Sequence, residues 1–143
     1  MEKWKIYAFA AALFAGLTAV IAKAGLKTLS ADLGLAVRSV FVCAFVVVNL
    51  FIWNSGHGAA LRSAGARTIG LLALSALTTT LSWVCYYRAM KDGTVSFVSL
   101  VDKGSIVVTL ALSVMLLGEP LTWRMAGGAA LIVAGLFVLT GGK

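Results

Sequence analysis

Asp102 and Lys103 are adjacent ionisable residues inside an otherwise apolar stretch, residues 99–120, which reads SLVDKGSIVVTLALSVMLLGEP. A charged side chain at the centre of a bilayer costs about 2.5 to 3.5 kcal/mol on insertion scales, so such residues need a partner, water or a functional role. A carboxylate in this position is suited to proton binding, and an ammonium group is suited to anion binding. Arg38 adds a guanidinium that can hold a carboxylate through two hydrogen bonds.

Hydroxyl and aromatic side chains share helical faces with these charges. At 100° per residue, a polar stripe within about 120° joins Ser99, Asp102, Ser105, Thr109 and Ser113. A second stripe within about 100° joins Ser75, Thr78, Thr79, Ser82 and Tyr86, with Trp83 at its edge. The predicted ligand contacts are therefore Arg38, Thr79, Ser82, Trp83, Tyr86, Ser99, Asp102 and Lys103, with Asp102 also a candidate proton-coupling group.

Depth in the bilayer gives a second reason to group these residues. Successive spans alternate direction, and residue counts place Arg38, Trp83, Asp102 and Lys103 in one layer, with Arg38 roughly 7 Å from the midplane. Such a layer predicts the floor of a hydroxyl-lined cavity with an excess positive charge, which favours anionic or carboxylate-bearing ligands.

Structural roles remain open for the same residues. Asp102 can form an ion pair with Lys103 or Arg38 that only fixes helix packing, and the side chains of Lys103 and Arg38 can extend toward the membrane surface. Serine and threonine hydroxyls can bond to carbonyls of their own helix. Tyr87 is expected in the belt of aromatic side chains at the lipid headgroups.

The composition excludes several other classes of protein. The chain has 143 residues, of which 61% are hydrophobic and 12% charged, which is typical of a membrane protein and not of a soluble domain. Its net charge of +7 comes from scattered basic residues, so nucleic-acid binding is not expected. Cys43 and Cys85 are expected to be buried thiols, and His57 by itself makes no metal site. No catalytic constellation is present, so we expect neither an enzyme nor a bound metal or cofactor.

The apolar segments predict an all-α membrane protein with one domain, residues 1–143. A span needs about 20 apolar residues, and five such segments are separated by short polar joints. The predicted spans are residues 6–22, 33–53, 68–90, 94–117 and 125–140. The first segment resembles a secretory signal but is long for one, so we expect it to be the first span.

The first and last predicted spans carry small residues in place of polar stripes. Ala12 and Gly16 in the first form a pair of the small-xxx-small type, which lets helices approach closely. The last span is the candidate for subunit contact, and the predicted dimer-packing residues are Gly127, Gly128, Ala130, Ala134 and Gly135.

Several motifs together resemble the EamA domain of the drug/metabolite transporter superfamily. They are AKAGL, LAVRSVFV, the long segment from LSWVCYYRAMKDGTVSFVSLVDKG to LLGEPLTW, and GGAALIVAGLFVL. The resemblance covers nearly the whole chain, and its last part, LLGEPLTW followed by GGAALIVAGL, is the most specific. It implies a multi-pass carrier of metabolites or drugs in a prokaryotic cytoplasmic (inner) membrane, often an exporter.

Family members of this kind usually carry two five-helix modules in inverted orientation, whereas this sequence has one. The basic residues that flank the spans are expected in equal number on the two sides of the membrane. One side has Lys3, Lys5, Arg62, Arg67 and Arg124, and the other has Lys23, Lys27, Arg88, Lys91 and Lys143. Balance permits insertion in both orientations, so we expect an antiparallel homodimer that transports a small molecule by alternating access. The alternative is a non-transporting membrane subunit that assembles with another membrane protein.

Overall fold

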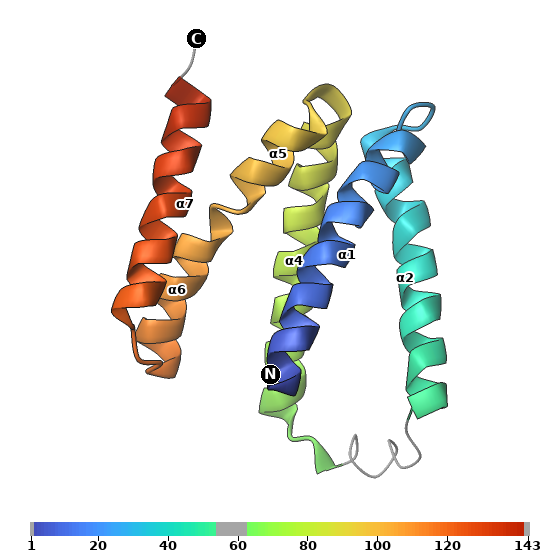
Figure 1. The fold of residues 1–143 in the computed structure, drawn as a ribbon. Helices are drawn as coiled ribbons and strands as arrows, with labels where there is room; N and C mark the ends of the chain where they lie inside the picture. The colour runs from blue at the N-terminus through green and yellow to red at the C-terminus, as the bar shows by residue number, and fades with distance from the viewer. Residues whose placement is uncertain (1, 54–62, 142–143) are drawn as a thin grey trace. The chain divides into compact units, whose positions relative to one another are not determined.

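The computed structural model describes residues 2–53 and 63–141, and all regular structure within them is helical. The helices are α1 (Lys3–Gly25), α2 (Ala31–Trp53), α4 (Ala66–Asp92), α5 (Val95–Asp102), α6 (Ser105–Leu117) and α7 (Trp123–Gly141) (Figure 1). Five segments are long and apolar enough to cross a membrane, with α5 and α6 together forming the fourth, Val95–Leu117. The prediction of an all-α membrane fold with five spans is confirmed.

The chain divides into two compact units, Met1–Asp92 and Gly93–Lys143. The first unit contains α1, α2 and α4, and the second contains α5, α6 and α7. Within the first unit, α1 and α4 run in the same direction and α2 runs in the opposite one (Figure 1). The carboxyl ends of α1 and α4 therefore lie at the end of the unit where α2 begins.

The best-packed part of the first unit lies at this end. Leu26, which caps α1, is 2% exposed, and Met90 near the end of α4 is fully buried. Ala31 and Leu35, four residues apart and on one face of α2, are also buried. Gly34 fits here because it has no side chain, since a Cβ at this position would meet the end of the Leu26 side chain.

Two lysines bind the helix ends of the first unit to each other. The Nζ atom of Lys23, in the last turn of α1, donates to the carbonyls of Met90 (2.6 Å) and Lys91 (3.1 Å) at the end of α4. The Nζ atom of Lys91 donates to the carbonyls of Leu26 (2.6 Å) and Leu29 (2.8 Å), which follow α1. The last carbonyls of a helix lack intrahelical partners and carry partial negative charge, so a cation there satisfies both needs. We call these four bonds the lysine latch.

Side-chain oxygens define where three helices begin. Ser30 Oγ accepts from the N–H of Leu33 before α2, Thr94 Oγ1 from Phe97 before α5, and Thr122 Oγ1 from Met125 before α7. These are N-cap bonds, which supply an acceptor to N–H groups that the helix leaves unpaired.

In the second unit the fourth span is not one continuous helix. Residues Lys103 and Gly104 form a tight turn in which Lys103 N–H donates to Leu100 and Gly104 N–H donates to Val101, at 3.1 and 2.9 Å. Bonds to the third preceding carbonyl mark 3₁₀ geometry, which turns about 120° per residue. The predicted fourth span, residues 94–117, is therefore present as Val95–Leu117, with this turn interrupting its helix. Gly104 permits the turn, because a Cβ would lie 2.9 Å from Leu136 Cδ1 of α7 and 3.0 Å from the Val101 carbonyl oxygen.

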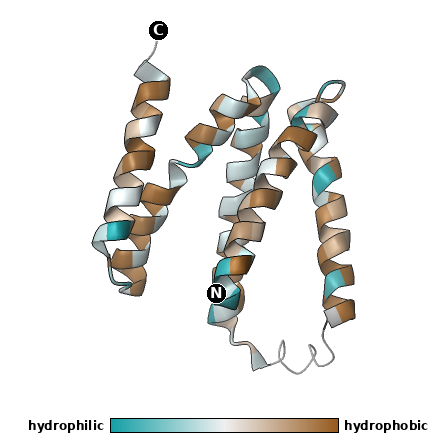
Figure 2. Ribbon diagram, in the orientation of Figure 1, coloured by the Kyte–Doolittle hydropathy of each residue, from teal (hydrophilic) through white to brown (hydrophobic). Residues whose placement is uncertain are grey.

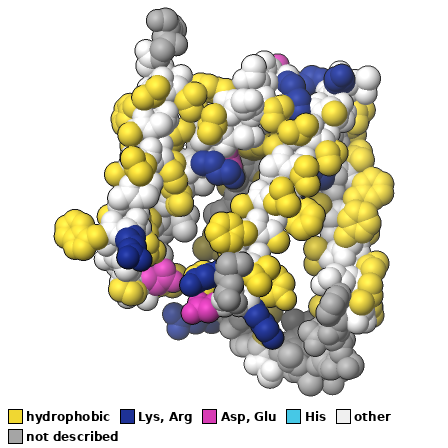
Figure 3. Space-filling view, viewed as in Figure 1, with side chains coloured by type: hydrophobic (Ala, Val, Ile, Leu, Met, Phe, Trp, Pro, Cys, Tyr) yellow, Lys and Arg dark blue, Asp and Glu magenta, His cyan; other side chains and the backbone are white. Residues whose placement is uncertain are grey.

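Large apolar side chains cover the outer surfaces of both units. Hydrophobic side chains dominate along the helices, and polar residues gather mainly toward their ends (Figures 2 and 3). Among many exposed examples, Phe14 is 65%, Phe45 68% and Phe137 72% exposed. In water such surfaces are unfavourable, whereas in hydrocarbon they cost nothing, so the outer surfaces are built for lipid or for other transmembrane helices.

Replacing either latch lysine by methionine should destabilise the protein. Lys23→Met or Lys91→Met keeps an apolar stem but removes the charged donor from two carbonyls, and hydrogen bonds with a charged partner contribute about 1.5 to 3 kcal/mol. The double variant should lose less than the sum of the single losses, because both lysines hold the same junction. Unfolding of the purified protein in detergent measures this. Lys27→Met, at an exposed lysine in the same turn region, is the control. Equal stability of the single variants Lys23→Met, Lys91→Met and Lys27→Met would contradict the latch.

Replacing Gly104 by alanine should also destabilise the protein, by about 1 to 3 kcal/mol, as expected for overpacking. The methyl group would press on Leu136 and on the Val101 carbonyl. Adding Leu136→Val, which removes the nearer atom, should recover part of the loss. Gly70→Ala is the control, because no atom lies within 4 Å of a Cβ there and alanine favours a helix. Equal melting temperatures for Gly104→Ala and Gly70→Ala would show that the turn tolerates a side chain.

Candidate functional site

Arg38 is held between helices α2 and α4 by aromatic rings. Its guanidinium carbon lies 4.4 Å from the ring centroid of Trp83 and 5.9 Å from that of Tyr87. Arg38 follows Ala31 and Leu35 on the same face of α2, so the packing that buries these two residues also turns Arg38 toward α4. A cation over an aromatic face is attracted by about 0.5 to 2 kcal/mol, more when water is excluded.

The partners of Arg38 recur at every fourth residue of α4. Trp83, Tyr87 and Lys91 therefore lie on one face, which reaches from the arginine to the lysine latch. Tyr87 is 4% exposed, so the expectation that it belongs to the headgroup belt is wrong. The sequence does contain a signal for this contact, because Tyr87 lies four residues after Trp83 and therefore on the same face of the helix. Tyr86, a predicted contact, has its ring 6.4 Å from that of Tyr87.

The charge of Arg38 is not neutralised within its own unit. Among residues 2–53 and 63–92, no carboxylate lies within salt-bridge distance of its guanidinium. Asp32, in the first turn of the same helix, is bound by Arg88, whose Nε and Nη2 donate to its two carboxylate oxygens at 3.0 and 3.2 Å. The Asp32–Arg88 pair thus removes a nearby acid from competition for Arg38.

A recess in the first unit contains this arginine. It has a volume of about 520 Å³ and is formed by α1, α2, the segment between them and Tyr87 of α4. Its lining is mainly apolar, and Arg38 is the one charged residue among the described residues that form it. The other lining residues are Thr18, Ile21, Ala22, Gly25, Leu26, Leu29, Gly34, Val37, Phe41 and Tyr87. The Thr18 hydroxyl donates to the carbonyl of Phe14 at 2.7 Å. We call this cavity the Arg38 recess.

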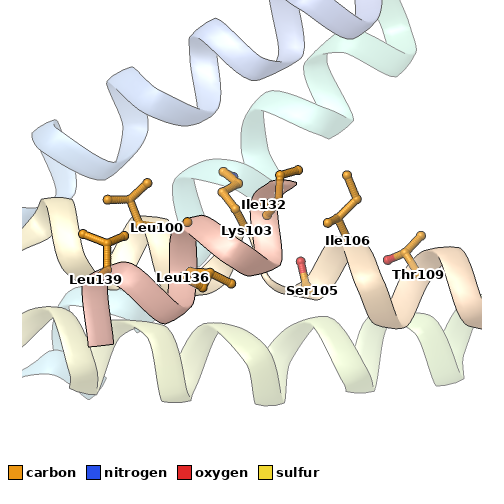
Figure 4. A pocket seen from close by; sticks show the side chains of 9 residues that line it. Leu100, Lys103, Ser105, Ile106, Thr109, Ile132, Leu136 and Leu139 are labelled. Atoms are coloured by element: carbon orange, nitrogen blue, oxygen red, sulfur yellow. The ribbon is translucent and has the colours of Figure 1, made fainter. Parts of the chain in front are cut away.

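A second recess lies within the second unit, beside the turn at Lys103 and Gly104. It also has a volume of about 520 Å³, and its apolar walls come from α5, α6 and α7 (Figure 4). Lys103, Ser105 and Thr109 bring polar atoms to its lining. Lys103 Nζ lies 3.6 Å from Asp102 Oδ2, and both side chains are exposed on the chain, so these neighbours form an ion pair at the helix break. Pairing lowers the cost of placing either charge in a membrane span.

The predicted hydroxyl contacts have mixed environments. Thr78 and Thr79 both donate to the carbonyl of Ser75, at 2.8 and 2.9 Å, and Ser113 donates to Leu110. For these residues the bond to their own helix, left open by the sequence, is the one that forms. Ser82 is exposed and Ser99 is partly buried. The oxygens of the bonded hydroxyls still offer an acceptor to a ligand.

The residues predicted to form one layer thus fall in both units. Arg38 and Trp83 belong to the first unit, whereas Asp102 and Lys103 belong to the second. Arg38 contacts Trp83, and Asp102 contacts Lys103. The common layer itself stays a prediction.

The residues that could bind a metal are scattered. Cys43 and Cys85 are free and exposed, so the expectation of buried thiols is wrong, since these sulfurs lie on outer helix surfaces. Among the described residues, no group of three His, Cys, Asp or Glu side chains is close enough to hold a metal ion. His57 lies outside the described residues.

The small residues of α7 lie on open surface. Gly127, Gly128, Ala130, Ala134 and Gly135 are all exposed, and a Cβ at any of the three glycines would meet no atom within 4 Å. Gly135 also borders the second recess. The face is therefore free to pack against another helix, and its role in a dimer stays a prediction.

Comparison with known proteins identifies the relatives of this fold. The family model of the EamA-like transporter family matches residues 2–141. A protein of Sinorhizobium sp, described as an uncharacterized transporter in the cobO 3′ region, is 36% identical over 138 residues, which cover 96% of each chain. No solved structure matches. Because the match covers 96% of each chain, the relative is similar in length to this sequence and also has about the size of one five-helix module.

The expectation that the chain is not an enzyme is confirmed, because the matched family consists of transporters and the relative is named as one. Three observations agree on the class of protein: the five apolar spans, the contact of Arg38 with Trp83 between two spans, and the family match. The chain belongs to the EamA-like transporter family and is a multi-pass membrane transporter for a small-molecule substrate.

Proposed function

We propose that this protein is a secondary transporter that exports a small metabolite or drug across the inner membrane of a prokaryote. The observation that carries the proposal is Arg38, an arginine seven residues into a membrane span. It lines a recess, contacts Trp83 and has no carboxylate partner among the described residues of its unit. At 1.5 Å per residue this position is about 10 Å below the start of α2. A charge kept unpaired at that depth is costly unless a ligand uses it.

Each predicted contact has a role in this proposal. In the first unit, Arg38 attracts the anionic group of a substrate, Trp83, Tyr86 and Tyr87 supply aromatic walls, and Thr79 and Ser82 supply hydroxyls. In the second unit, Lys103 attracts an anionic group and Ser99 supplies a hydroxyl.

Asp102 is the proposed coupling residue. Its ion pair with Lys103 holds while the carboxylate is ionised, and protonation would break the attraction and leave Lys103 as a free cation at the helix break. Broken helices in other secondary transporters hold substrate and ion sites, because irregular backbone offers polar groups within the membrane. A proton on Asp102 would thereby change the affinity of the second recess for an anion.

The working unit in this proposal is an antiparallel homodimer. One module supplies only half of an inverted repeat, and two copies inserted in opposite directions restore it. The open face of α7, with its glycines, is the proposed contact between copies. The Sinorhizobium relative of matching length supports a functional unit that starts from single modules.

Asp102→Asn should abolish or uncouple transport while the protein stays folded and dimeric. Asparagine keeps the shape but cannot carry a proton between the two sides. Proteoliposomes tested with a panel of metabolites, with and without a pH gradient, identify the transported compound and then compare the variant, which should lose at least tenfold in gradient-driven flux. Glu119→Gln, at an exposed acid after α6, is the matched control. If the unmodified protein transports none of the compounds and Asp102→Asn releases it from a complex with another membrane protein, the non-transporting alternative is correct.

Reporter proteins fused after Lys143 should label both sides of the membrane in similar amounts. The basic residues that flank the spans are balanced, so neither orientation is strongly favoured. Adding two lysines beside Lys3 should shift the labelling to one side and reduce flux, because oppositely oriented partners become scarce. Labelling of a single side in the unmodified protein would overturn the antiparallel dimer.

A further inference from the structure

We propose that the Arg38 recess selects amphipathic monoanions, molecules with one carboxylate and an apolar body, and rejects cations and zwitterions of the same size. The inference rests on the proposed transport function, because it names the class of substrate for that same site.

The guanidinium is available to bind a carboxylate. The Trp83 ring centroid lies 4.4 Å from the guanidinium carbon, and this cation–π contact gives the guanidinium no carboxylate partner. Arg38 therefore keeps a fork of N–H donors that can make two parallel bonds to a carboxylate. Tyr87, almost fully buried, holds the arginine from a second side and so reduces its freedom to reach the membrane surface.

The surroundings accept one negative charge and hold no carboxylate, among the described residues, to pair with a positive one. No Asp or Glu of residues 2–53 and 63–141 lines the recess, and Asp32 is bound to Arg88 through both of its oxygens. An ammonium group entering here would give up its water without gaining a carboxylate, and it would be repelled by Arg38. For a zwitterionic amino acid, the unfavourable free energy of placing its ammonium group here therefore offsets the favourable bonds between its carboxylate and Arg38.

The remaining walls fit an apolar body. Ile21, Leu26, Leu29, Val37 and Phe41 surround the space beside the arginine, and its volume of about 520 Å³ suits a small organic molecule. An anionic head with an apolar body is also the chemistry of an anionic lipid. We commit to a soluble carboxylate, and the test separates the two sources.

The test uses Trp83 as its own reporter. The full-length protein with Trp4, Trp53 and Trp123 replaced by phenylalanine is reconstituted in phosphatidylcholine vesicles, and Trp83 emission is titrated with three ligands that share one phenyl body. These are 3-phenylpropionate, phenylalanine and 3-phenylpropylamine, which are an anion, a zwitterion and a cation. We expect 3-phenylpropionate to bind at least about tenfold more tightly than the other two. Equal affinity for all three would overturn the proposal.

Variants assign any preference to Arg38. Arg38→Gln should remove the preference for the anion, and Arg38→Lys, which keeps the charge but not the fork of donors, should weaken anion binding several-fold. Lys27→Gln removes the same charge from an exposed position outside the recess and should leave the affinity unchanged. Equal effects of Lys27→Gln and Arg38→Gln would reduce the preference to overall charge and overturn the site.

A last pair of measurements separates this inference from its neighbours. If phosphatidylglycerol alone changes Trp83 emission through Arg38 and 3-phenylpropionate does not, the recess holds a lipid headgroup and the substrate class is wrong. If anion selectivity fails while Asp102-dependent flux of another compound persists, the transporter stands and only the substrate class falls. If selective anion binding occurs without any flux, the recess stands and the transport proposal falls.

Discussion

The first unit depends on the reciprocal bonds between Lys23, Lys91 and the helix ends that they reach. Transmembrane helices gain little from hydrophobic association, because lipid is as apolar as the side chains that they would bury. Buried carbonyls without donors are costly in such surroundings. The lysine latch meets both constraints at once, since each helix sends a cation to the electronegative end of the other. It lies where the buried residues Leu26 and Met90 gather, so polar bonding and close packing reinforce each other.

The latch also sets the register of the ligand site. Lys91, Tyr87 and Trp83 recur at every fourth position, so fixing Lys91 against the end of α1 fixes the height of both rings along α4. Arg38 then meets these rings because α2 packs on α4 through the same face that buries Ala31 and Leu35. The cation in the recess is therefore supported by contacts that begin at the membrane surface and continue inward.

The second unit solves a similar problem by different means. The two charges within its first span are neighbours in sequence and form an ion pair, and the backbone beside them departs from α-helical geometry. Gly104 allows this because the space that a side chain would need is occupied by Leu136 and by the Val101 carbonyl. A pair of charges and a helix break at one point give the second recess polar atoms that a regular apolar helix would lack.

The sequence by itself determined the fold class, the number of spans, the family and the residues with chemistry, because these follow from apolar length, charge position and local motifs. It did not reveal the interruption at Gly104, since a 100° period assumes a continuous helix, whereas the N–H groups of Lys103 and Gly104 bond to the third preceding carbonyl. It assigned Tyr87 to the headgroups, because depth alone cannot tell a ring facing lipid from a ring facing Arg38. It counted Lys23 and Lys91 only as flanking charges. Their bonds to carbonyls more than sixty residues away exist only once α1 and α4 lie in parallel, and that is a property of the tertiary structure.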